Sequence, residues 1–429
     1  MSKITTFVVT GTKGKTSVVT LINHFLGPNY HKLLVSSEGV FLNSRKIASY
    51  QDSLINFSGR SPNVRPGRYV VHNLFRKTRI SLVDQPKIAV LESSLGCGKR
   101  GTGVEEYTED GFHDIGIFTN VYSDHLNYTT LCSQQDIYQA KSFVFTKLKP
   151  MGKYIASLDN SFTYQSLREP VLLNKQAIKV GISQLKNQPD KLAQLAETLN
   201  LSDIFYLNED NWVCSLTLGN LFKLTNFAYF FGQKPSGIVE SLLFAVAACT
   251  DYVGLPDLTS RVRTFRFRLA SGRLLGFQKD NQTLILDYAH EIESLNFLLN
   301  DFSYKFPNVR PWLITRVAPD RPDQYIQEYG QDIAKLNQIQ KLIVYDKLTS
   351  RGISYQYSWG ERHPNETGQL FFNSIKQSNP NFVVEFSQNS EVDTLQAALA
   401  SGYPLIIHIY SNIQRVLKFI RQAGFRRIL

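Results

Sequence analysis

A short loop near the N-terminus carries the residue types that bind phosphate groups. Residues 10–17 read Thr-Gly-Thr-Lys-Gly-Lys-Thr-Ser. Gly11 and Gly14 allow the backbone to approach an anion closely, because glycine has no Cβ atom. Lys15 can neutralise the outer phosphates of a nucleotide, and the Thr16 hydroxyl can contact a magnesium ion. The loop therefore predicts a site for a phosphate-bearing ligand.

Two predicted elements position this loop. The apolar run from Ile4 to Val9 predicts a buried strand, and residues 18–26 place apolar side chains at helical spacing. The glycines thus fall on a strand-to-helix turn, where the free amides of the first helical turn point at an anion. A turn that binds no ligand is the alternative, since the longer phosphate-loop motif has a glycine where this chain has Val9.

A carboxylate and a histidine follow the next two predicted strands. Residues 87–92 form an apolar run that ends at Glu92, and residues 115–120 form another that is followed by His125. Parallel strands present their carboxyl ends at one edge of a sheet, so both side chains would meet the loop there. Together they could hold a metal ion against a transferred phosphate.

Lys141 is a third candidate for this site. The neighbouring Phe143 and Phe145 indicate a half-buried helix, and a buried lysine requires a partner. Each residue by itself has a plainer alternative. Glu92 could cap a helix, His125 could be a surface histidine, and Lys141 could be a solvated helix lysine.

The composition is that of a folded protein with more than one domain. The 429 residues are 43% hydrophobic and 19% charged, which allows two or three domains with separate cores. Strand-like runs alternate with helical ones, which predicts an α/β fold with a parallel, doubly wound sheet. No apolar run approaches the roughly 20 residues that cross a bilayer. With no signal peptide in the first residues, we expect a cytoplasmic protein without a membrane partner.

The charge and the cysteines exclude several other classes. The four cysteines are far apart and form no Cys-x-x-Cys pair, so neither a zinc ribbon nor a disulfide framework is indicated. The net charge of +11 suits nucleic acid, but the basic residues are scattered and no RNA-binding signature is present. Residues 261–268 alternate like a strand with one charged face. An anionic small substrate explains the charge at least as well, and we expect no nucleic-acid partner.

Several of these segments resemble motifs of the Mur ligase superfamily, whose members form amide bonds with ATP. The loop is similar to the superfamily's Thr-Gly-Thr-x-Gly-Lys-Thr motif. Residues 124–128 are similar to its Asp-His-Leu-Asp-Tyr segment, and residues 138–143 to its Tyr-x-x-Ala-Lys segment, although only one residue separates Tyr138 from Ala140 here. Gly-Arg at residues 272–273, followed by Asp-Tyr-Ala-His at residues 287–290, resembles the signature that opens the C-terminal domain.

The chain looks most like the Mur ligase module of cyanophycin synthetases. The runs that carry this likeness are residues 38–42, 91–100, 318–323 and 348–352. The chain departs from the superfamily pattern at several positions. Asn127 replaces an aspartate, Ser241 stands where an asparagine beside adenine is implied, and Glu291 alters the turn after His290.

The resemblance implies a set of site residues. ATP would be bound by Gly11, Thr12, Gly14, Lys15, Thr16, Ser17, Asn120, Arg273, Asp287 and His290. Two magnesium ions would be held by Thr16, Glu92, His125 and Lys141, with a carbamate on Lys141 as in the family. Lys15, Lys141 and His125 would serve catalysis, and Arg321 and Arg351 would bind the substrate.

The resemblance also implies the architecture and the reaction. Residues 1–270 would form a central ATP-binding domain with the P-loop and a parallel doubly wound sheet. Residues 271–429 would form a smaller, Rossmann-like C-terminal domain. In such ligases ATP phosphorylates a substrate carboxylate and an amine attacks the acyl phosphate, which yields an amide, ADP and phosphate.

The substrates and alternatives follow from what the chain lacks. The loop begins too early for the N-terminal domain with which peptidoglycan ligases hold their UDP-sugar, so we expect a peptide, an amino acid polymer or a pathway intermediate as the carboxylate, together with an amine. The ATP-grasp half of cyanophycin synthetase is missing, which suggests a separate ATP-grasp partner. A P-loop kinase or NTPase, and a catalytically silent subunit of a larger synthetase, are the alternatives.

Overall fold

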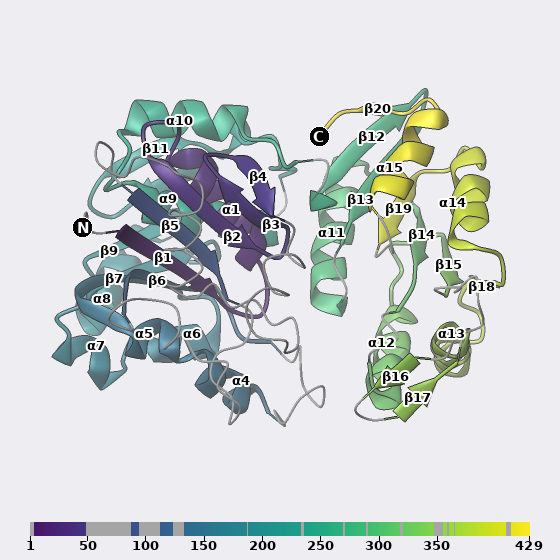
Figure 1. The fold of residues 1–429 in the computed structure, drawn as a ribbon, viewed down its shortest axis with the longest axis horizontal. Helices are drawn as coiled ribbons and strands as arrows, with labels where there is room; N and C mark the ends of the chain where they lie inside the picture. The colour runs from purple at the N-terminus through teal and green to yellow at the C-terminus, as the bar shows by residue number, and fades with distance from the viewer. Residues whose placement is uncertain are drawn as a thin grey trace. The chain divides into compact units, whose positions relative to one another are not determined.

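The chain forms two compact units (Figure 1). Unit 1 comprises Met1–Phe230 and Lys234–Phe265, and unit 2 comprises Phe231–Gln233 and Arg266–Leu429. The structure, a computed structural model, describes residues 4–48, 87–93, 112–122, 133–186, 188–232, 236–268, 271–288, 291–317, 321–346, 355–357, 360–363, 365–408 and 413–429.

Unit 1 is built on one sheet with a parallel centre. Its strands are β1 (Ile4–Thr10), β2 (His31–Ser36), β3 (Gly39–Leu42), β4 (Arg45–Ala48), β5 (Lys87–Glu92), β6 (His113–Phe118), β7 (Leu148–Ser157), β8 (Ile178–Ser183), β9 (Asp203–Leu207), β10 (Trp212–Ser215) and β11 (Gly219–Lys223). They lie in the order β11-β10-β9-β8-β7-β6-β1-β5-β2-β3-β4. The strands from β9 to β2 in this order run parallel, and antiparallel strands form both edges. β1 therefore lies between two parallel neighbours, at the centre of the sheet.

Helices cover both faces of this sheet. They are α1 (Lys15–Phe25), α4 (Gln134–Lys141), α5 (Phe143–Thr146), α6 (Ser161–Ser166), α7 (Pro170–Asn174), α8 (Pro189–Leu199), α9 (Gly237–Cys249) and α10 (Leu255–Thr264), with a 3-10 turn at Leu224–Asn226. α1 and α9 pack together on one face, while α5, α6 and α8 cover the other (Figure 1). Apolar residues fill almost all of α9, because this helix is enclosed by its neighbours.

Buried lysines lie near the amino ends of three strands of this sheet. Lys32 in β2, Lys153 in β7 and Lys179 in β8 each donate to a carbonyl group in the last turn of a helix, namely α1, α9 and α8 respectively. A cation at a helix C-terminus is stabilised by the helix dipole and satisfies carbonyl groups that have no partner within the helix. These contacts fix helix C-termini at the amino edge of the sheet, which leaves helix N-termini at the carboxyl edge.

Unit 2 contains a second, largely parallel sheet. Its strands are β12 (Leu275–Lys279), β13 (Gln282–Asp287), β14 (Trp312–Thr315), β15 (Lys341–Tyr345), β18 (Val384–Ser387), β19 (Leu405–His408) and β20 (Arg426–Arg427), and a separate pair is formed by β16 (Tyr355–Tyr357) and β17 (Gly360–Arg362). The main sheet has the order β18-β15-β14-β19-β13-β12-β20, and only β12 and β20 are antiparallel to their neighbours.

Helices also cover this second sheet. They are α11 (Ile292–Lys305), α12 (Asp323–Ile333), α13 (Glu366–Ser378), α14 (Glu391–Ala400) and α15 (Ile413–Gln422). α11, α12 and α13 share a core with Leu313, Val344 and Ile406 of the sheet. α14 and α15 pack against each other and lie apart from this core (Figure 1). The sheet is therefore buried on both faces, as parallel sheets are.

The predicted α/β class is confirmed, and one local prediction is wrong. The expected strand at residues 87–92 has these bounds in the structure, and the strand expected at residues 115–120 is β6, His113–Phe118. Residues 261–268 are not a strand, because α10 continues to Thr264 with Leu258 and Val262 four residues apart on its buried side. Residues 265–268 follow the helix without regular secondary structure, with Phe265 and Phe267 buried. In the described part of the chain, every helix is too short or too polar to cross a membrane.

We expect Lys153→Met to lower the free energy of unfolding by about 1–3 kcal/mol, because a buried carbonyl group loses its donor. Lys153 Nζ donates to the Ala247 carbonyl at 2.8 Å and pairs with Asp251 at 2.9 Å. Urea unfolding measures the change. Lys191→Met is the matched control, because the Lys191 side chain is exposed on α8. It should change this free energy by less than about 0.5 kcal/mol. Equal effects of the two substitutions would contradict the capping role.

Candidate functional site

The loop between β1 and α1 has a backbone conformation that suits an anion. Gly11 has a φ of 140° and Gly14 a φ of 77°, both in the region that favours glycine. A Cβ atom at Gly11 would lie 2.0 Å from Thr119 Oγ1, so a larger residue does not fit there. Gly14 is the N-cap of α1, where no side chain caps the helix and the first turn has no acidic residue. The amides at the positive end of the helix therefore face the loop.

Hydrogen bonds from the segment after β6 hold this loop. The Asn120 carbonyl accepts from the Thr12 amide at 2.9 Å, and Asn120 Oδ1 accepts from the Lys13 amide at 2.8 Å. Thr119 Oγ1 donates to the Lys13 carbonyl at 2.7 Å, and the Tyr122 amide donates to Thr12 Oγ1 at 3.0 Å. Asn120, which we expected to bind the nucleotide, thus contacts the backbone of the loop. The Thr12 hydroxyl accepts from Tyr122 of the same segment.

Lys15 lies across the loop that precedes it. Its Nζ donates to the carbonyl groups of Gly11 and Thr12, at 2.9 Å in each case. Lys15 is the first residue of α1, and Thr16 and Ser17 follow it in the same turn. The ammonium group therefore lies against the loop from which α1 begins, and a phosphate bound by the loop would be close to it.

A buried carboxylate lies against the first turn of α1. Thr16 Oγ1 donates to Glu92 Oε1 at 2.9 Å, and the Ser37 amide donates to Glu92 Oε2 at 2.9 Å. Glu92 ends β5 and is only 4% exposed. Hydroxyl and carboxylate oxygens are the ligands that Mg²⁺ prefers, so these donors fit that ion. Ser37 was not predicted, because its place here depends on the pairing of β2 with β5.

Lys141 ends α4 and is completely buried. The helix begins with a capping box in which Ser133 and Asp136 exchange hydrogen bonds. Tyr138 stacks on Phe118 with ring centroids 6.1 Å apart, which fixes the helix against the sheet. The sequence indicated half-burial, and the packing of α4 makes the burial complete. A buried ammonium group is costly unless its surroundings compensate the charge.

Three predicted site residues lie outside the described residues, namely His125, His290 and Arg351. The segment with Asn127 also lies outside them. Across the described ranges, no group of three or more His, Cys, Asp and Glu side chains is placed to hold a metal ion. The predicted metal set of Thr16, Glu92, His125 and Lys141 therefore stays a prediction.

Glu240 completes a hydrogen-bond chain behind the loop, and the sequence showed it only as one acidic residue within an apolar helix. Glu240 Oε1 accepts from Ser157 Oγ at 2.8 Å, and its carboxyl group also hydrogen-bonds the Asn120 side chain. Asn120 in turn holds the Lys13 amide. Partial burial raises the pKa of Glu240 to about 7, with a further contribution from the Asp159 charge, while the hydrogen bonds oppose the rise.

Ser241 lies beside the loop, at the position where the resemblance implied an asparagine. Its Oγ is 3.1 Å from the place that a Cβ atom on Gly14 would occupy. The hydroxyl donates to the Gly237 carbonyl at 2.8 Å, one turn earlier in α9. The start of α9 and the loop are therefore neighbours, although more than 200 residues separate them in sequence.

Three predicted residues of unit 2 lie near the carboxyl edge of its sheet. Asp287 ends β13, and its Oδ2 accepts from the Leu274 amide at 2.9 Å, which brings Arg273 to the same edge. Arg321 precedes α12, and its guanidinium carbon lies 5.7 Å from the centroid of the Tyr325 ring. The hydrogen bond from Leu274 thus brings the neighbouring Arg273 close to the end of β13. Arg321 follows the end of β14 in the chain.

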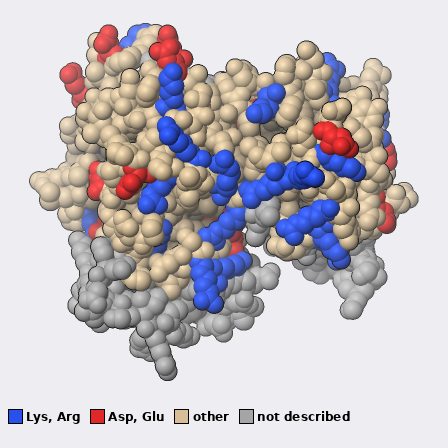
Figure 2. Space-filling model, turned by 90° about the horizontal axis from the view of Figure 1, so that it is seen from above, with Lys and Arg blue, Asp and Glu red and all other residues tan. Residues whose placement is uncertain are grey.

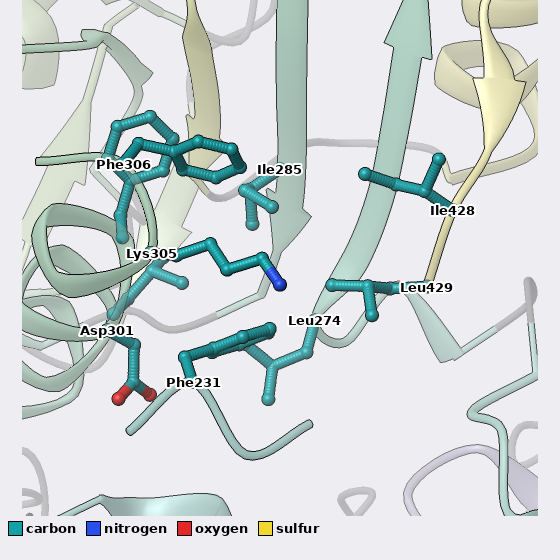
Figure 3. A pocket seen from close by; sticks show the side chains of 10 residues that line it. Phe231, Leu274, Ile285, Asp301, Lys305, Phe306, Ile428 and Leu429 are labelled. Carbon is teal, nitrogen blue, oxygen red and sulfur yellow. The ribbon is translucent and has the colours of Figure 1, made fainter. Parts of the chain in front are cut away.

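A cavity of about 150 Å³ lies in unit 2 (Figure 3). Its lining is Phe231, Leu274, Ile285, Leu298, Asp301, Phe302, Lys305, Phe306, Ile428 and Leu429. Lys305 extends across it, with Nζ 5.5 Å from the centroid of the Phe231 ring, and the Asp301 carboxylate points away from that ammonium group (Figure 3). None of the predicted site residues lines this cavity, although Leu274 of its lining donates its backbone amide to Asp287.

Basic residues dominate the charged surface on one face of the molecule (Figure 2). On the face drawn in Figure 2, Lys and Arg cover more of the described surface than Asp and Glu do. This agrees with the net charge of +11. Such a surface raises the local concentration of small anions.

Comparisons with known proteins agree on one family. The model of the Mur ligase middle domain matches residues 9–230. The chain is similar to the cyanophycin synthetase of Nostoc sp., with 21% identity over 97% of this chain, and to that of Synechocystis sp., with 22% identity over 90%. It spans about two fifths of the length of these relatives, 42% and 40% respectively.

Solved structures show the same fold. E. coli FolC in complex with DHPP and ADP is similar with a TM-score of 0.64 and 14% identity, over 97% of this chain and 88% of that chain. MurF from Acinetobacter baumannii is similar with a TM-score of 0.61 and 12% identity, over 98% and 77%. Folylpolyglutamate synthase of Mycobacterium tuberculosis, complexed with ADP and AMPPCP, has a TM-score of 0.61 and 11% identity, over 99% and 92%. The predicted fold is confirmed by these likenesses.

We expect Glu240→Gln to change the pH dependence of stability, because the pKa of Glu240 is raised from 4.5 to about 7. Below pH 4.5 the carboxyl group is protonated in both states. As the pH rises from 4.5 to 7 the unfolded chain loses the proton first, so the wild-type free energy of unfolding falls by up to about 3 kcal/mol relative to Glu240→Gln. Urea unfolding of both proteins at pH 4.5, 6 and 8 measures this difference. Parallel pH profiles would contradict the raised pKa.

Proposed function

The chain belongs to the Mur ligase family, and we propose that it is an ATP-dependent, ADP-forming ligase that joins a carboxylate to an amine. The family consists of ATP-dependent enzymes that form amide bonds. One observation carries the proposal for this chain. The glycine loop, with Gly11 and Gly14 at positive φ, is followed directly by Thr16, whose hydroxyl lies 2.9 Å from the Glu92 carboxylate. The groups that can donate hydrogen bonds to a phosphate and the oxygens that can bind magnesium are thus adjacent.

The two units correspond, in this proposal, to two family domains. Unit 1 is the central ATP-binding domain, expected over residues 1–270, and the middle-domain match at residues 9–230 supports this. Unit 2 is the C-terminal domain, expected over residues 271–429. Arg273, Asp287 and His290 contribute from unit 2 to nucleotide binding.

The residues of unit 1 bind ATP and offset its charge. The α1 amides and Lys15 hold the phosphates, and the Lys15 ammonium stabilises the negative charge that develops on the transferred phosphoryl group. Thr16 would hold one magnesium ion, and Glu92, His125 and a carbamylated Lys141 would hold a second. Bound ions would supply electrostatic stabilisation of the phosphates. Asn120 and Glu240 keep the loop in position through the hydrogen bonds described above.

The proposed reaction has two steps. A carboxylate oxygen of the substrate attacks the γ-phosphorus of ATP, the bond to the β-phosphate oxygen breaks, and ADP leaves. The amine nitrogen then attacks the acyl carbon, phosphate leaves, and the amine gives up a proton. Positioning of the two substrates supplies a large part of the rate enhancement in such reactions.

The substrates are small molecules or peptides with an acidic group. Arg321 and Arg351 bind the acidic part, since guanidinium groups grip carboxylates through paired hydrogen bonds. The likeness to cyanophycin synthetases supports an amino acid or a peptide as one substrate. A separate ATP-grasp partner is part of this proposal, and full activity of the purified chain by itself would remove it.

Release of phosphate from ATP across a panel of acids and amines tests the function. Release that requires both an acid and an amine, with an amide as product, supports the ligase. Release without an amine points to a P-loop kinase or NTPase, and ATP binding without release points to a silent subunit. A P-loop kinase accounts for Lys15 and Thr16 but leaves Lys141 and residues 287–290 without a role.

We expect Lys15→Ala to lower turnover by about 100-fold or more, because the transferred phosphoryl group loses the cation at the start of α1. Steady-state phosphate release measures the loss. Lys191→Ala is the matched control, since Lys191 is exposed on α8, and its turnover should equal that of the wild type. Comparable activity in Lys15→Ala would remove the loop from the reaction.

Lys141→Ala should abolish turnover, and a short carboxylic acid should partly restore it if the lysine acts as a carbamate. The acid would take the place of the carbamate oxygens in the space that the truncated side chain leaves. Phosphate release with and without added acetate measures the rescue. Urea unfolding of the variant separates lost chemistry from lost folding, because Lys141 is completely buried. Retained activity of a folded Lys141→Ala protein would reject the carbamate role.

A further inference from the structure

A buried guanidinium group lies at the carboxyl edge of the unit 2 sheet. Arg316 follows β14 directly and is only 8% exposed. Its Nε and Nη1 atoms are buried and have no hydrogen-bond partner among the described residues. Burial of a cation costs several kcal/mol, and proteins offset this with acceptors for its N–H groups. The described part of unit 2 supplies none for these two nitrogens.

The sheet register places Arg316 beside Tyr345. Thr315 pairs with Val344 between β14 and β15, so the next residue pair is Arg316 and Tyr345. Val344 lies in the core under α11, α12 and α13. Since side chains alternate along a strand, Arg316 and Tyr345 point to the opposite face, where Tyr345 meets Glu391 of α14. Burial raises the pKa of Tyr345 well above its usual value, and the nearby Arg316 charge opposes that rise.

The acidic residues near this edge use their carboxylates elsewhere. Glu391 Oε1 accepts from the Tyr345 hydroxyl at 3.1 Å. Asp346 Oδ2 accepts from the Gly368 amide at 2.9 Å, and Asp346 is 4% exposed. Among the described residues, no carboxylate forms an ion pair with Arg316. The charge of Arg316 is therefore available to a ligand, and it lies at the sheet edge where open α/β sheets bind ligands.

We propose that Arg316 anchors an oxyanion-binding site of unit 2, which takes a carboxylate or phosphate group of a small ligand. The planar guanidinium presents several N–H donors in a fixed fork that matches the oxygens of such groups. The burial of Arg316 strengthens this contact, because charges interact more strongly away from water. The site involves neither the phosphate loop nor Arg273, Asp287 and Arg321, so it goes beyond the proposed function and does not depend on it.

Thermal unfolding of the full chain tests this site. The chain carries Lys15→Ala, so that the phosphate loop does not contribute, and is heated in chloride with or without phosphate, acetate or glutarate at equal ionic strength. An oxyanion at about five times its Kd should raise Tm by roughly 2–4 °C. The same oxyanion should leave Tm unchanged when Arg316→Met is added. A response to phosphate alone would assign a phosphoryl group, and a response to acetate or glutarate alone would assign a carboxylate.

Arg421→Met is the matched control, because Arg421 is exposed on α15 of the same unit. This variant should keep the full oxyanion response. Arg316→Met should also be at least as stable as its parent in chloride, since it removes a buried charge at similar volume. If the variant does not fold, isothermal titration of the Lys15→Ala chain with the three anions decides the question. An oxyanion response that survives in Arg316→Met, or no binding of any of the three anions, would overturn the proposal.

Discussion

The close approach of Gly11 to Thr119 is the contact on which the candidate site of unit 1 depends. A Cβ atom at Gly11 would lie 2.0 Å from Thr119 Oγ1, so only glycine allows the loop to rest against the end of β6. Once the loop lies there, the amides of Thr12 and Lys13 reach Asn120. Because α1 begins directly after the loop, the loop's position also brings Thr16 to the Glu92 carboxylate. One steric constraint thus positions both the amides that can bind a phosphate and the Thr16 and Glu92 oxygens that can bind magnesium.

The direction of the strands explains why these groups meet at one edge. Buried lysines satisfy helix C-termini at the amino edge of the unit 1 sheet, as Lys32, Lys153 and Lys179 show. The free helix amides and strand-end polar residues are left at the carboxyl edge, where they favour anions. Glu240 adds a partly buried carboxyl group behind the loop, and a raised pKa of this group lowers stability near neutral pH.

Unit 2 follows the same geometry with different chemistry. Its parallel strands also end in polar residues, among them Asp287 at β13 and Arg316 after β14. Two nitrogens of the buried Arg316 guanidinium have no hydrogen-bond partner among the described residues, whereas the buried lysines of unit 1 each donate to helix carbonyls. This contrast separates a cation that stabilises the fold from one that is positioned for a ligand.

The sequence by itself determined the local features. The glycine loop between an apolar strand and an amphipathic helix, and Glu92 at the end of β5, could be predicted because they depend on neighbouring residues and on strand periodicity. The segment at 261–268 was misjudged, since alternation alone does not distinguish a helix end from a strand. The tertiary structure decided the places of Ser37, Glu240 and Arg316. Each depends on strand register or helix packing between residues far apart in the chain, and no pattern within one segment encodes such contacts.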